Sequence, residues 1–278
     1  VGRDDRVREG LLRLSVSPDD FEIQNARVCP LVPEMTERLY ARLQRRGYLM
    51  RDCQRLVNQD RNVFGALLLD LGAGDAMITG VTRHFRQTMV QVKLVIDQAG
   101  GHVPFGIHMM VGQKHTVFIP DTTDNERPTA WELPDIAEQT AAVARRMGQE
   151  PRVAFLSYAN FGNPPPKWLD AVRDAVGLLD ERGVGFEYEG EMTPDVALNR
   201  EMQRHYPFNR LSGPANVLIM PGLQSANITA KLLKELGNGV VLGPFLVGMA
   251  KPVQIAAMTS TASDLTTMAV MAAAGAVG

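Results

Sequence analysis

The stretch that decides the fold is residues 216–245, NVLIM-PGLQSANITAKLLKELGNG-VVLGPF. Its apolar runs and glycine breakers predict a buried strand over 216–220, a helix over 225–236 and a second strand over 240–245. Strand and helix alternate in the same way along most of the chain. This alternation is typical of an α/β fold with a mainly parallel sheet and helices on both faces.

The other elements are predicted from the same two signals, apolar periodicity and Gly or Pro breakers. We expect further strands over residues 21–26, 76–79, 105–110, 116–119, 153–157 and 186–191. We expect helices over 36–46, with Thr36 as N-cap, and over 50–58, 62–70, 86–98, 135–147, 167–182 and 263–274. Residues 1–3 read as the end of a strand that enters a turn.

Composition and charge exclude several classes of protein. The chain has 29 Lys and Arg against 31 Asp and Glu, a net charge of −2, and 45% hydrophobic residues. These values are typical of a globular protein and argue against one that binds nucleic acid or a membrane surface through a basic face. The apolar tract 268–277 is too short to span a bilayer, and no secretory signal is visible. We therefore expect a cytoplasmic protein, with Cys29 and Cys53 as ordinary thiols.

Ligands of such folds bind beyond the carboxyl ends of strands, which makes three loops candidate sites. In the loop 157–166, Gly162 allows close approach of the backbone to a ligand, and Phe161 offers a flat apolar surface. A turn without a ligand explains this loop equally. The five histidines show no metal-ligand spacing, so no metal site is expected.

The second and third loops each precede a predicted helix. In residues 221–227, Ser225 or Asn227 is expected to cap a helix whose N-terminus attracts anions. Lys231 lies one turn further on. The third loop is 248–264, in which Thr261 and Ser263 are candidate caps. Asp264 suits the first turn of the last helix, and its effect on the helix dipole alone could explain it.

Several motifs then combine into one pattern. They are GDAMITG at 74–80, PRVAFLSY at 151–158, GPANVLIMP at 213–221, SANI at 225–228, Gly243-Pro244 and KPV at 251–253. Together they resemble the phosphate acetyltransferase (phosphotransacetylase) family. The resemblance implies two α/β/α domains with an interdomain cleft, one of residues 1–106 and 252–278, the other of 107–251. It also implies that one N-terminal βαβ unit of the family is missing.

A second set of motifs is closer to one branch of that family. It comprises FLSYANFG at 155–162, EYEGEM at 187–192, DVALN at 195–199, YPF at 206–208 and LSGPAN at 211–216. These resemble the phosphotransacetylase-like C-terminal domain of hybrid NADP-dependent malic enzymes, which convert malate to pyruvate and CO₂. The resemblance implies acetyl-CoA as effector and a two-fold phosphotransacetylase-type homodimer. NADP and Mg or Mn are implied only for an N-terminal malic enzyme domain of the same chain.

The departures from the family concern its cationic groups. Phe161 precedes Gly162 where the family has lysine, and Ala257-Met258 stands where it has a Ser-Arg pair. Only the acid, Asp264, is retained as a residual candidate base. Acyl transfer needs cations for the phosphate and the oxyanion, so the domain is expected to be catalytically silent.

A pocket that no longer catalyses acetyl transfer can still bind acetyl-CoA. The residues expected to line it are Ser157, Asn160, Phe161, Gly162, Gln224, Ser225, Asn227, Lys231, Lys251, Met258 and Asp264. Two alternatives stay open. One is a working phosphate acetyltransferase, and the other is a dimerisation scaffold without a ligand.

Overall fold

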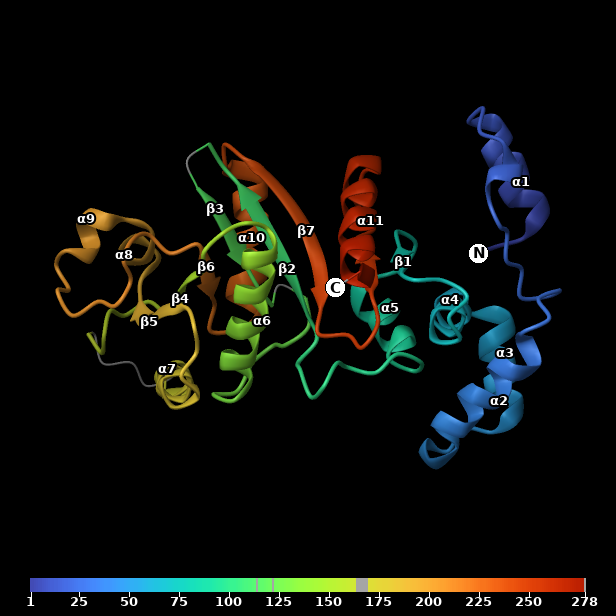
Figure 1. The fold of residues 1–278 in the computed structure, drawn as a ribbon, viewed down its shortest axis with the longest axis horizontal. Helices are drawn as coiled ribbons and strands as arrows, with labels where there is room; N and C mark the ends of the chain where they lie inside the picture. The colour runs from blue at the N-terminus through green and yellow to red at the C-terminus, as the bar shows by residue number, and fades with distance from the viewer. Residues whose placement is uncertain (114, 122, 164–169, 278) are drawn as a thin grey trace.

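Two sheets form the framework of the protein. A computed structural model of the chain describes residues 1–113, 115–121, 123–163 and 170–277. Within them, a six-stranded sheet has the order β5–β4–β6–β3–β2–β7, and β1 pairs with β8 in a two-stranded sheet (Figure 1). The strands are β1 Met77–Gly80, β2 Phe105–Val111, β3 Thr116–Ile119, β4 Arg152–Leu156, β5 Glu187–Met192, β6 Val217–Ile219, β7 Val240–Val247 and β8 Val253–Ala256.

The strand pairing confirms the prediction of mainly parallel sheets. Strands β5, β4, β6 and β3 run parallel to one another, as do β1 and β8. Strand β2 runs antiparallel to both of its neighbours, β3 and β7. Strands β6 and β7 therefore run in the same direction, joined by a helix as the stretch 216–245 predicted.

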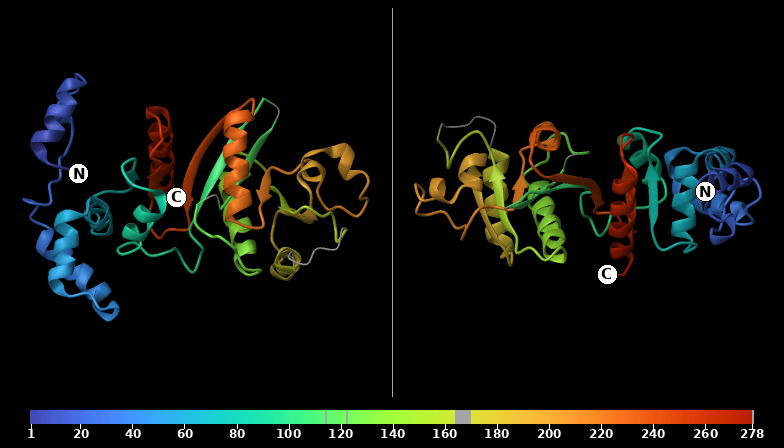
Figure 2. Two further views of the ribbon diagram at one scale, coloured as in Figure 1. Left: turned by 180° about the vertical axis from the view of Figure 1, so that it is seen from behind. Right: turned by 90° about the horizontal axis from the view of Figure 1, so that it is seen from above.

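Helices cover both faces of the large sheet. The α-helices of the described chain are α1 Asp4–Arg13, α2 Val32–Leu43, α3 Met50–Gln59, α4 Arg61–Asp70, α5 Phe85–Val92, α6 Glu132–Arg146, α7 Asp170–Arg182, α8 Pro194–Leu198, α9 Arg200–Gln203, α10 Leu223–Leu236 and α11 Ala262–Val277, of which α6, α7, α8 and α10 cover the large sheet. Helices α6 and α7 pack on the face that carries Phe118 and Phe155. Helices α10 and α8 pack on the face that carries Leu156 and Leu218, which is seen from behind in Figure 2.

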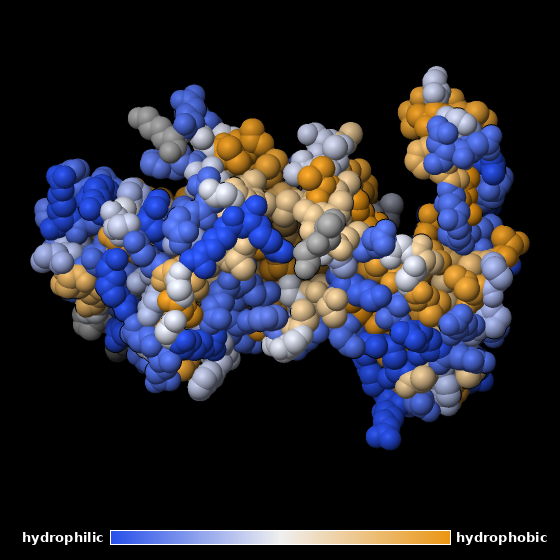
Figure 3. All heavy atoms as spheres, in the orientation of Figure 1, coloured by the Kyte–Doolittle hydropathy of each residue, from blue (hydrophilic) through white to orange (hydrophobic). Residues whose placement is uncertain are grey.

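A separate core lies between the remaining helices and the small sheet. Helices α2 to α5 bury Leu39, Phe64 and Leu67 together with Ile255 of β8. Helix α1 buries none of its residues, and hydrophobic side chains are visible on its surface in Figure 3. No helix in the described part of the chain combines the length and the apolar character needed to cross a bilayer.

Two predictions at the N-terminus are wrong. Residues 21–26 form no strand, since the backbone bond from Gly2 N to Gln24 O (2.9 Å) is not extended into a ladder. An isolated extended segment lacks the neighbouring strand that stabilises a sheet. Residues 1–3 likewise pair with no described strand, and α1, which was not predicted, begins directly after them.

Other errors concern where elements begin and end. Helix α2 begins at Val32, before Pro33, and the Thr36 hydroxyl bonds to the Val32 carbonyl (2.8 Å) inside the helix rather than capping it. Strand β8 lies in a stretch interpreted as a loop, and helices α8 and α9 were not predicted. The predicted helix 167–182 is observed from Asp170, because 167–169 lie outside the described residues.

Candidate functional site

The predicted loops after β4 and β6 meet at one edge of the large sheet. Because β3, β4, β5 and β6 are parallel, the segments that follow them gather at their carboxyl ends. Ser157 and Ser225, from the first and second predicted loops, line the same groove. The two loops therefore lie side by side, although these residues are almost seventy positions apart in the chain.

The loop after β4 is fixed by its own polar groups. The Ser157 hydroxyl accepts a hydrogen bond from Ala159 N (2.9 Å). The Asn160 side-chain oxygen accepts from the backbone N–H of Thr193 (2.8 Å) and from its hydroxyl (3.1 Å). Both predicted ligand residues therefore have structural partners in this structure.

Phe161 is held in an aromatic cluster. Its ring lies 5.0 Å from that of Tyr206 and 4.8 Å from that of Phe208, measured between centroids. Its backbone is left-handed (φ +50°), an uncommon conformation for a bulky residue, and its N–H donates to Glu191 O (2.9 Å). This position therefore presents aromatic carbon and offers no charged donor.

A buried ion pair holds the next residue of the loop. The carboxylate of Glu191, whose side chain is 0% exposed, accepts from Gly162 N at 2.9 Å. Arg173 of α7 contacts the same carboxylate through two nitrogens at 3.2 and 3.3 Å. Sequence reasoning quoted Glu191 only as part of a family motif and missed its role, because its partner lies on a different element.

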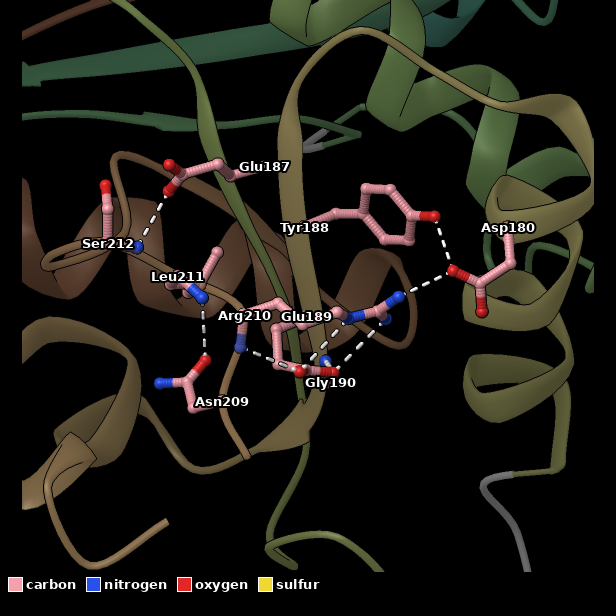
Figure 4. A network of polar contacts seen from close by, with 9 residues as sticks. All are labelled: Asp180, Glu187, Tyr188, Glu189, Gly190, Asn209, Arg210, Leu211 and Ser212. Carbon is pink, nitrogen blue, oxygen red and sulfur yellow. Dashed lines mark hydrogen bonds and ion pairs between the residues drawn. The ribbon is translucent and has the colours of Figure 1, made fainter. Parts of the chain in front are cut away.

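A second polar network fastens the segment that follows Tyr206 and Phe208 to β5 (Figure 4). Arg210 donates to the buried Glu189 (3.2 Å) and to Asp180 (2.5 Å), and its guanidinium lies 4.6 Å from the centre of the Tyr188 ring. The Tyr188 hydroxyl also donates to Asp180 (2.5 Å). Burial and the neighbouring Asp180 raise the pKa of Tyr188, so its hydroxyl stays protonated and can donate.

Helix α10 begins earlier than predicted. Gly222 precedes its first turn, and the Ser225 hydroxyl bonds to the Gly222 carbonyl (2.8 Å), so neither Ser225 nor Asn227 is the N-cap residue. A side chain at Gly222 would place its Cβ 2.7 Å from the carbonyl oxygen of Glu126. The glycine thus lets the loop after β3 approach closely, and Asn125 O accepts from Leu223 N (3.3 Å).

This close approach leaves a hollow of about 530 Å³ beside the α10 N-terminus. Its lining consists of Glu126, Arg127, Pro221, Gly222, Gln224 and Ser225. Arg86, at the start of α5, bonds to Glu126 (3.2 Å) and ties the hollow to the other half of the molecule. The helix N-terminus and Arg127 both favour an anion here.

The remaining residues predicted on α10 lie further along it. Asn227 is half-buried, whereas Gln224 and Lys231 are exposed. Burial lowers the pKa of His108 on β2 to about 4, with Lys234 and Lys231 adding to the effect.

The third predicted loop lies apart from this hollow. Lys251 donates its ammonium to the carbonyls of Leu69 (3.0 Å) and Asp70 (3.3 Å) at the end of α4. Asp264 accepts from Thr261 N (2.8 Å) and donates its own N–H to the Thr261 hydroxyl (3.2 Å), so Thr261 is the cap, as predicted. Met258 is exposed. None of these residues lines the hollow. The two hydrogen bonds between Thr261 and Asp264 form a capping box, and this structural role explains Asp264 without a catalytic one.

Asp121, which sequence reasoning passed over, lies on the loop after β3. It is 5% exposed and left-handed (φ +52°), and its Oδ1 accepts from Asn125 N (3.1 Å) and Nδ2 (3.0 Å). Its other oxygen has no partner among the described residues. Burial raises the pKa of this carboxyl from 3.8 to about 6.

This shift predicts a pH-dependent stability. Because the pKa of Asp121 is higher in the folded than in the unfolded state, the folded protein binds this proton more tightly. The resulting stabilisation is complete below about pH 4 and is lost as the pH rises through 6. Asp121→Asn is therefore expected to match the native protein near pH 4 and to be more stable at pH 7.5, by no more than about 3 kcal/mol. Urea unfolding at both pH values measures this. An equal difference at both would contradict it.

The described residues hold no group of three or more His, Cys, Asp or Glu side chains able to bind a metal ion. What the edge of the sheet does offer is an anion-attracting hollow and a neutral, aromatic loop. At Phe161 the neighbouring side chains of Tyr206 and Phe208 are aromatic.

Comparison with known proteins agrees with this geometry. The profile of the "Phosphate acetyl/butaryl transferase" family matches residues 1–273. The chain is 47% identical over 275 residues to the NADP-dependent malic enzyme of Rhizobium meliloti, covering 98% of this chain and 36% of that protein. It is 25% identical over 276 residues to the phosphate acetyltransferase of Bacillus subtilis, covering 99% and 85%.

A solved structure shows the same fold. The phosphotransacetylase of Streptococcus pyogenes superposes with a TM-score of 0.93 at 28% identity, covering 99% of this chain and 84% of that one. The chain therefore spans about a third of the malic enzyme it matches and most of each acetyltransferase.

Proposed function

Because the chain belongs to the phosphate acetyl/butaryl transferase family, we propose that it is the regulatory part of an NADP-dependent malic enzyme. In this proposal it binds acetyl-CoA without transferring the acetyl group and assembles as a two-fold dimer. The oxidation of malate to pyruvate and CO₂ takes place in another part of the protein, in the cytoplasm. The 47% identity to a malic enzyme, over 36% of that enzyme's length, supports this division.

The observation that carries the proposal is the packing of Phe161 between Tyr206 and Phe208. Transfer of an acetyl group between phosphate and CoA needs a base for the thiol and cations for the phosphate and the oxyanion. The resemblance assigns a lysine to the position of Phe161. Here the side chain is neutral, and its neighbours stabilise it as part of a small apolar core.

The hollow beside α10 is the place we assign to the negative end of acetyl-CoA. Its volume of about 530 Å³ falls within the roughly 300–1,000 Å³ common for ligand pockets. Arg127 and the helix N-terminus supply positive potential for phosphate groups. Gln224 and Ser225, which line the hollow, are among the ligand residues predicted from the sequence.

Titration calorimetry of the protein with acetyl-CoA tests the proposal. We expect saturable heat, and an affinity at least about tenfold lower for Arg127→Glu, a loss of about 1.4 kcal/mol. Arg13→Glu on α1, which alters an exposed arginine away from the hollow, is the matched control and should bind normally. Gln224→Trp, at a residue that lines the hollow, is expected to fill it and abolish binding. Absence of both heat and a thermal shift at millimolar acetyl-CoA would rule the proposal out.

A second function, a dimerisation scaffold without a ligand, is favoured by one observation. An apolar groove of about 810 Å³ between α10 and α8 has no Lys, Arg, Asp or Glu among the described residues that line it. A dimer that gives no binding heat with acetyl-CoA in the calorimetric experiment would support this second function.

A further inference from the structure

A slot of about 550 Å³ lies between α6 and α11. The end of β7 and the segment that joins β7 to β8 line its base. Figure 2 shows α6 and α11 on either side of β7. The described residues that line the slot include none that line the hollow beside α10 or the apolar groove. The slot is therefore a separate cavity, to which the proposed function assigns no ligand.

Small side chains on both helices leave this space open. The residues of α6 that line the slot have the spacing of one helical face, and they are Gln139, Ala142, Val143 and Arg146. Helix α11 contributes Ala274 and Gly275 from the opposite side. Because Ala142, Ala274 and Gly275 carry at most a methyl group, the two helices do not interlock across the slot.

Much of the lining is apolar and adaptable. Met147 and Met271 are partly buried against the cluster that contains Phe245 and Met268. Met249, from the segment after β7, also lines the slot. Methionine side chains are flexible and adjust to apolar ligands of different shape. Figure 3 shows hydrophobic surface where β7 meets α11, so an occupant with an apolar chain would be covered there.

The slot also carries a positive charge that the fold does not use. Arg146 is exposed, and its guanidinium has no hydrogen bond or ion pair within the described part of the chain. The last carbonyls of α6 do not need it, because Gly148 N donates to Arg145 O and Gln149 N to Ala144 O, both at 2.9 Å. Among the described residues that line the slot there is no Asp or Glu to neutralise this charge.

The other two basic residues of the lining are held in place. The Lys251 ammonium is bonded to the carbonyls at the end of α4. His102 Nδ1 is bonded to Asp135 (2.6 Å), which also accepts from Val103 N (2.7 Å) and from Gln139 Nε2 (2.9 Å). These bonds fix the imidazole ring and leave its Nε2 for a ligand. The polar rim of the slot therefore favours an anion.

We propose that the slot binds a carboxylate with an apolar chain. The carboxylate pairs with the Arg146 guanidinium, which can donate two parallel hydrogen bonds to it, and the chain lies along Val143, Met147 and Met271. The volume falls within the roughly 300–1,000 Å³ common for ligand pockets. The inference goes beyond the proposed function and does not depend on acetyl-CoA binding.

The position of the slot gives such a ligand a structural effect. The two segments that connect the cores of the molecule pair beside it, through Ala99 N to Gly248 O (2.8 Å) and Ala250 N to Asp97 O (2.9 Å). Both Ala99 and Gly248 line the slot. A ligand bound there contacts both connections at once, so it should raise the melting temperature of the whole chain.

Titration calorimetry of the protein with octanoate tests the proposal. We expect saturable heat and a thermal shift, and an affinity at least about tenfold lower for Arg146→Glu, because the guanidinium that pairs with the carboxylate is replaced by a like charge. Arg145→Glu is the matched control, since Arg145 is the neighbouring residue but does not line the slot. Ala142→Trp should fill the slot and abolish binding. Octan-1-ol, which lacks the charge, and acetate, which lacks the chain, should each bind at least about tenfold more weakly.

The outcomes separate this inference from the proposed function. A native chain with neither heat nor thermal shift at millimolar octanoate would overturn it. Octanoate binding that survives both Arg146→Glu and Ala142→Trp would also overturn it, because the ligand would then lie elsewhere. So would equal losses for Arg145→Glu and Arg146→Glu, which would show that net charge governs binding. Circular dichroism establishes that each variant is folded, and Ala142→Leu replaces Ala142→Trp if that one is not. Acetyl-CoA binding by the same variants should equal that of the native chain.

Discussion

Given acetyl phosphate and CoA, the protein is expected to form acetyl-CoA about 10⁴-fold more slowly than a phosphate acetyltransferase, or slower still. By the resemblance, two cationic positions and one hydroxyl are replaced by Phe161, Met258 and Ala257. Loss of one oxyanion donor typically costs about 10²–10³ in rate, and the resemblance assigns a second cation and a hydroxyl to the same centre, so a total loss of about 10⁴ is expected. A coupled spectrophotometric assay of the thiol or thioester measures the rate.

The control for this assay is the Bacillus subtilis enzyme, which aligns over 99% of the chain. Phe161→Lys alone is expected to leave the rate low, because the position lies inside the cluster with Tyr206 and Phe208. A native rate within tenfold of the control enzyme would overturn the catalytically silent interpretation. It would support the alternative of a working acetyltransferase.

Among the stability variants proposed for this protein, Arg173→Ala is expected to lower the free energy of unfolding most, by about 3 kcal/mol. The change leaves the fully buried carboxylate of Glu191 without its cation, and removing one partner of a buried ion pair costs about 3–5 kcal/mol. The lower end applies because Arg173 is 42% exposed and water screens the pair. Urea denaturation measures the change in free energy of unfolding.

Two variants make this experiment specific. Arg182→Ala breaks an exposed ion pair with Glu138 (2.6 Å) and should cost no more than about 1 kcal/mol. Adding Glu191→Gln to Arg173→Ala removes the unpaired charge and should recover part of the loss. Equal losses for Arg173→Ala and Arg182→Ala would show that burial of Glu191 does not govern the effect.

The sequence predicted correctly those strands whose apolar run and whose Gly or Pro breakers lie within one short segment. The runs at 105–110, 116–119 and 216–220 are apolar, end in breakers and form β2, β3 and β6. The same reasoning failed for 21–26, because alternation in one segment does not provide a second strand to pair with. It also failed for β8, because this short segment is a strand only through its hydrogen bonds to β1, which is distant in sequence.

The candidate site shows the same division between local and long-range information. Parallel strands imply that the loops with Ser157 and Ser225 meet, and these residues do line one groove. Lys251 was expected beside them, yet its ammonium binds the carbonyls of Leu69 and Asp70 at the end of α4, 182 and 181 residues away in sequence. No property of the lysine or its neighbours in sequence encodes that contact.

The sequence by itself determined the α/β class, the parallel strands and the family, because periodicity, breakers and motifs are properties of neighbouring residues. Only the tertiary structure decided that Phe161 joins Tyr206 and Phe208 and that Glu191 pairs with Arg173. It also decided that Ser157 and Ser225 line one apolar groove. These features depend on which distant surfaces pack together, since burial and pairing are set by residues far apart in the chain.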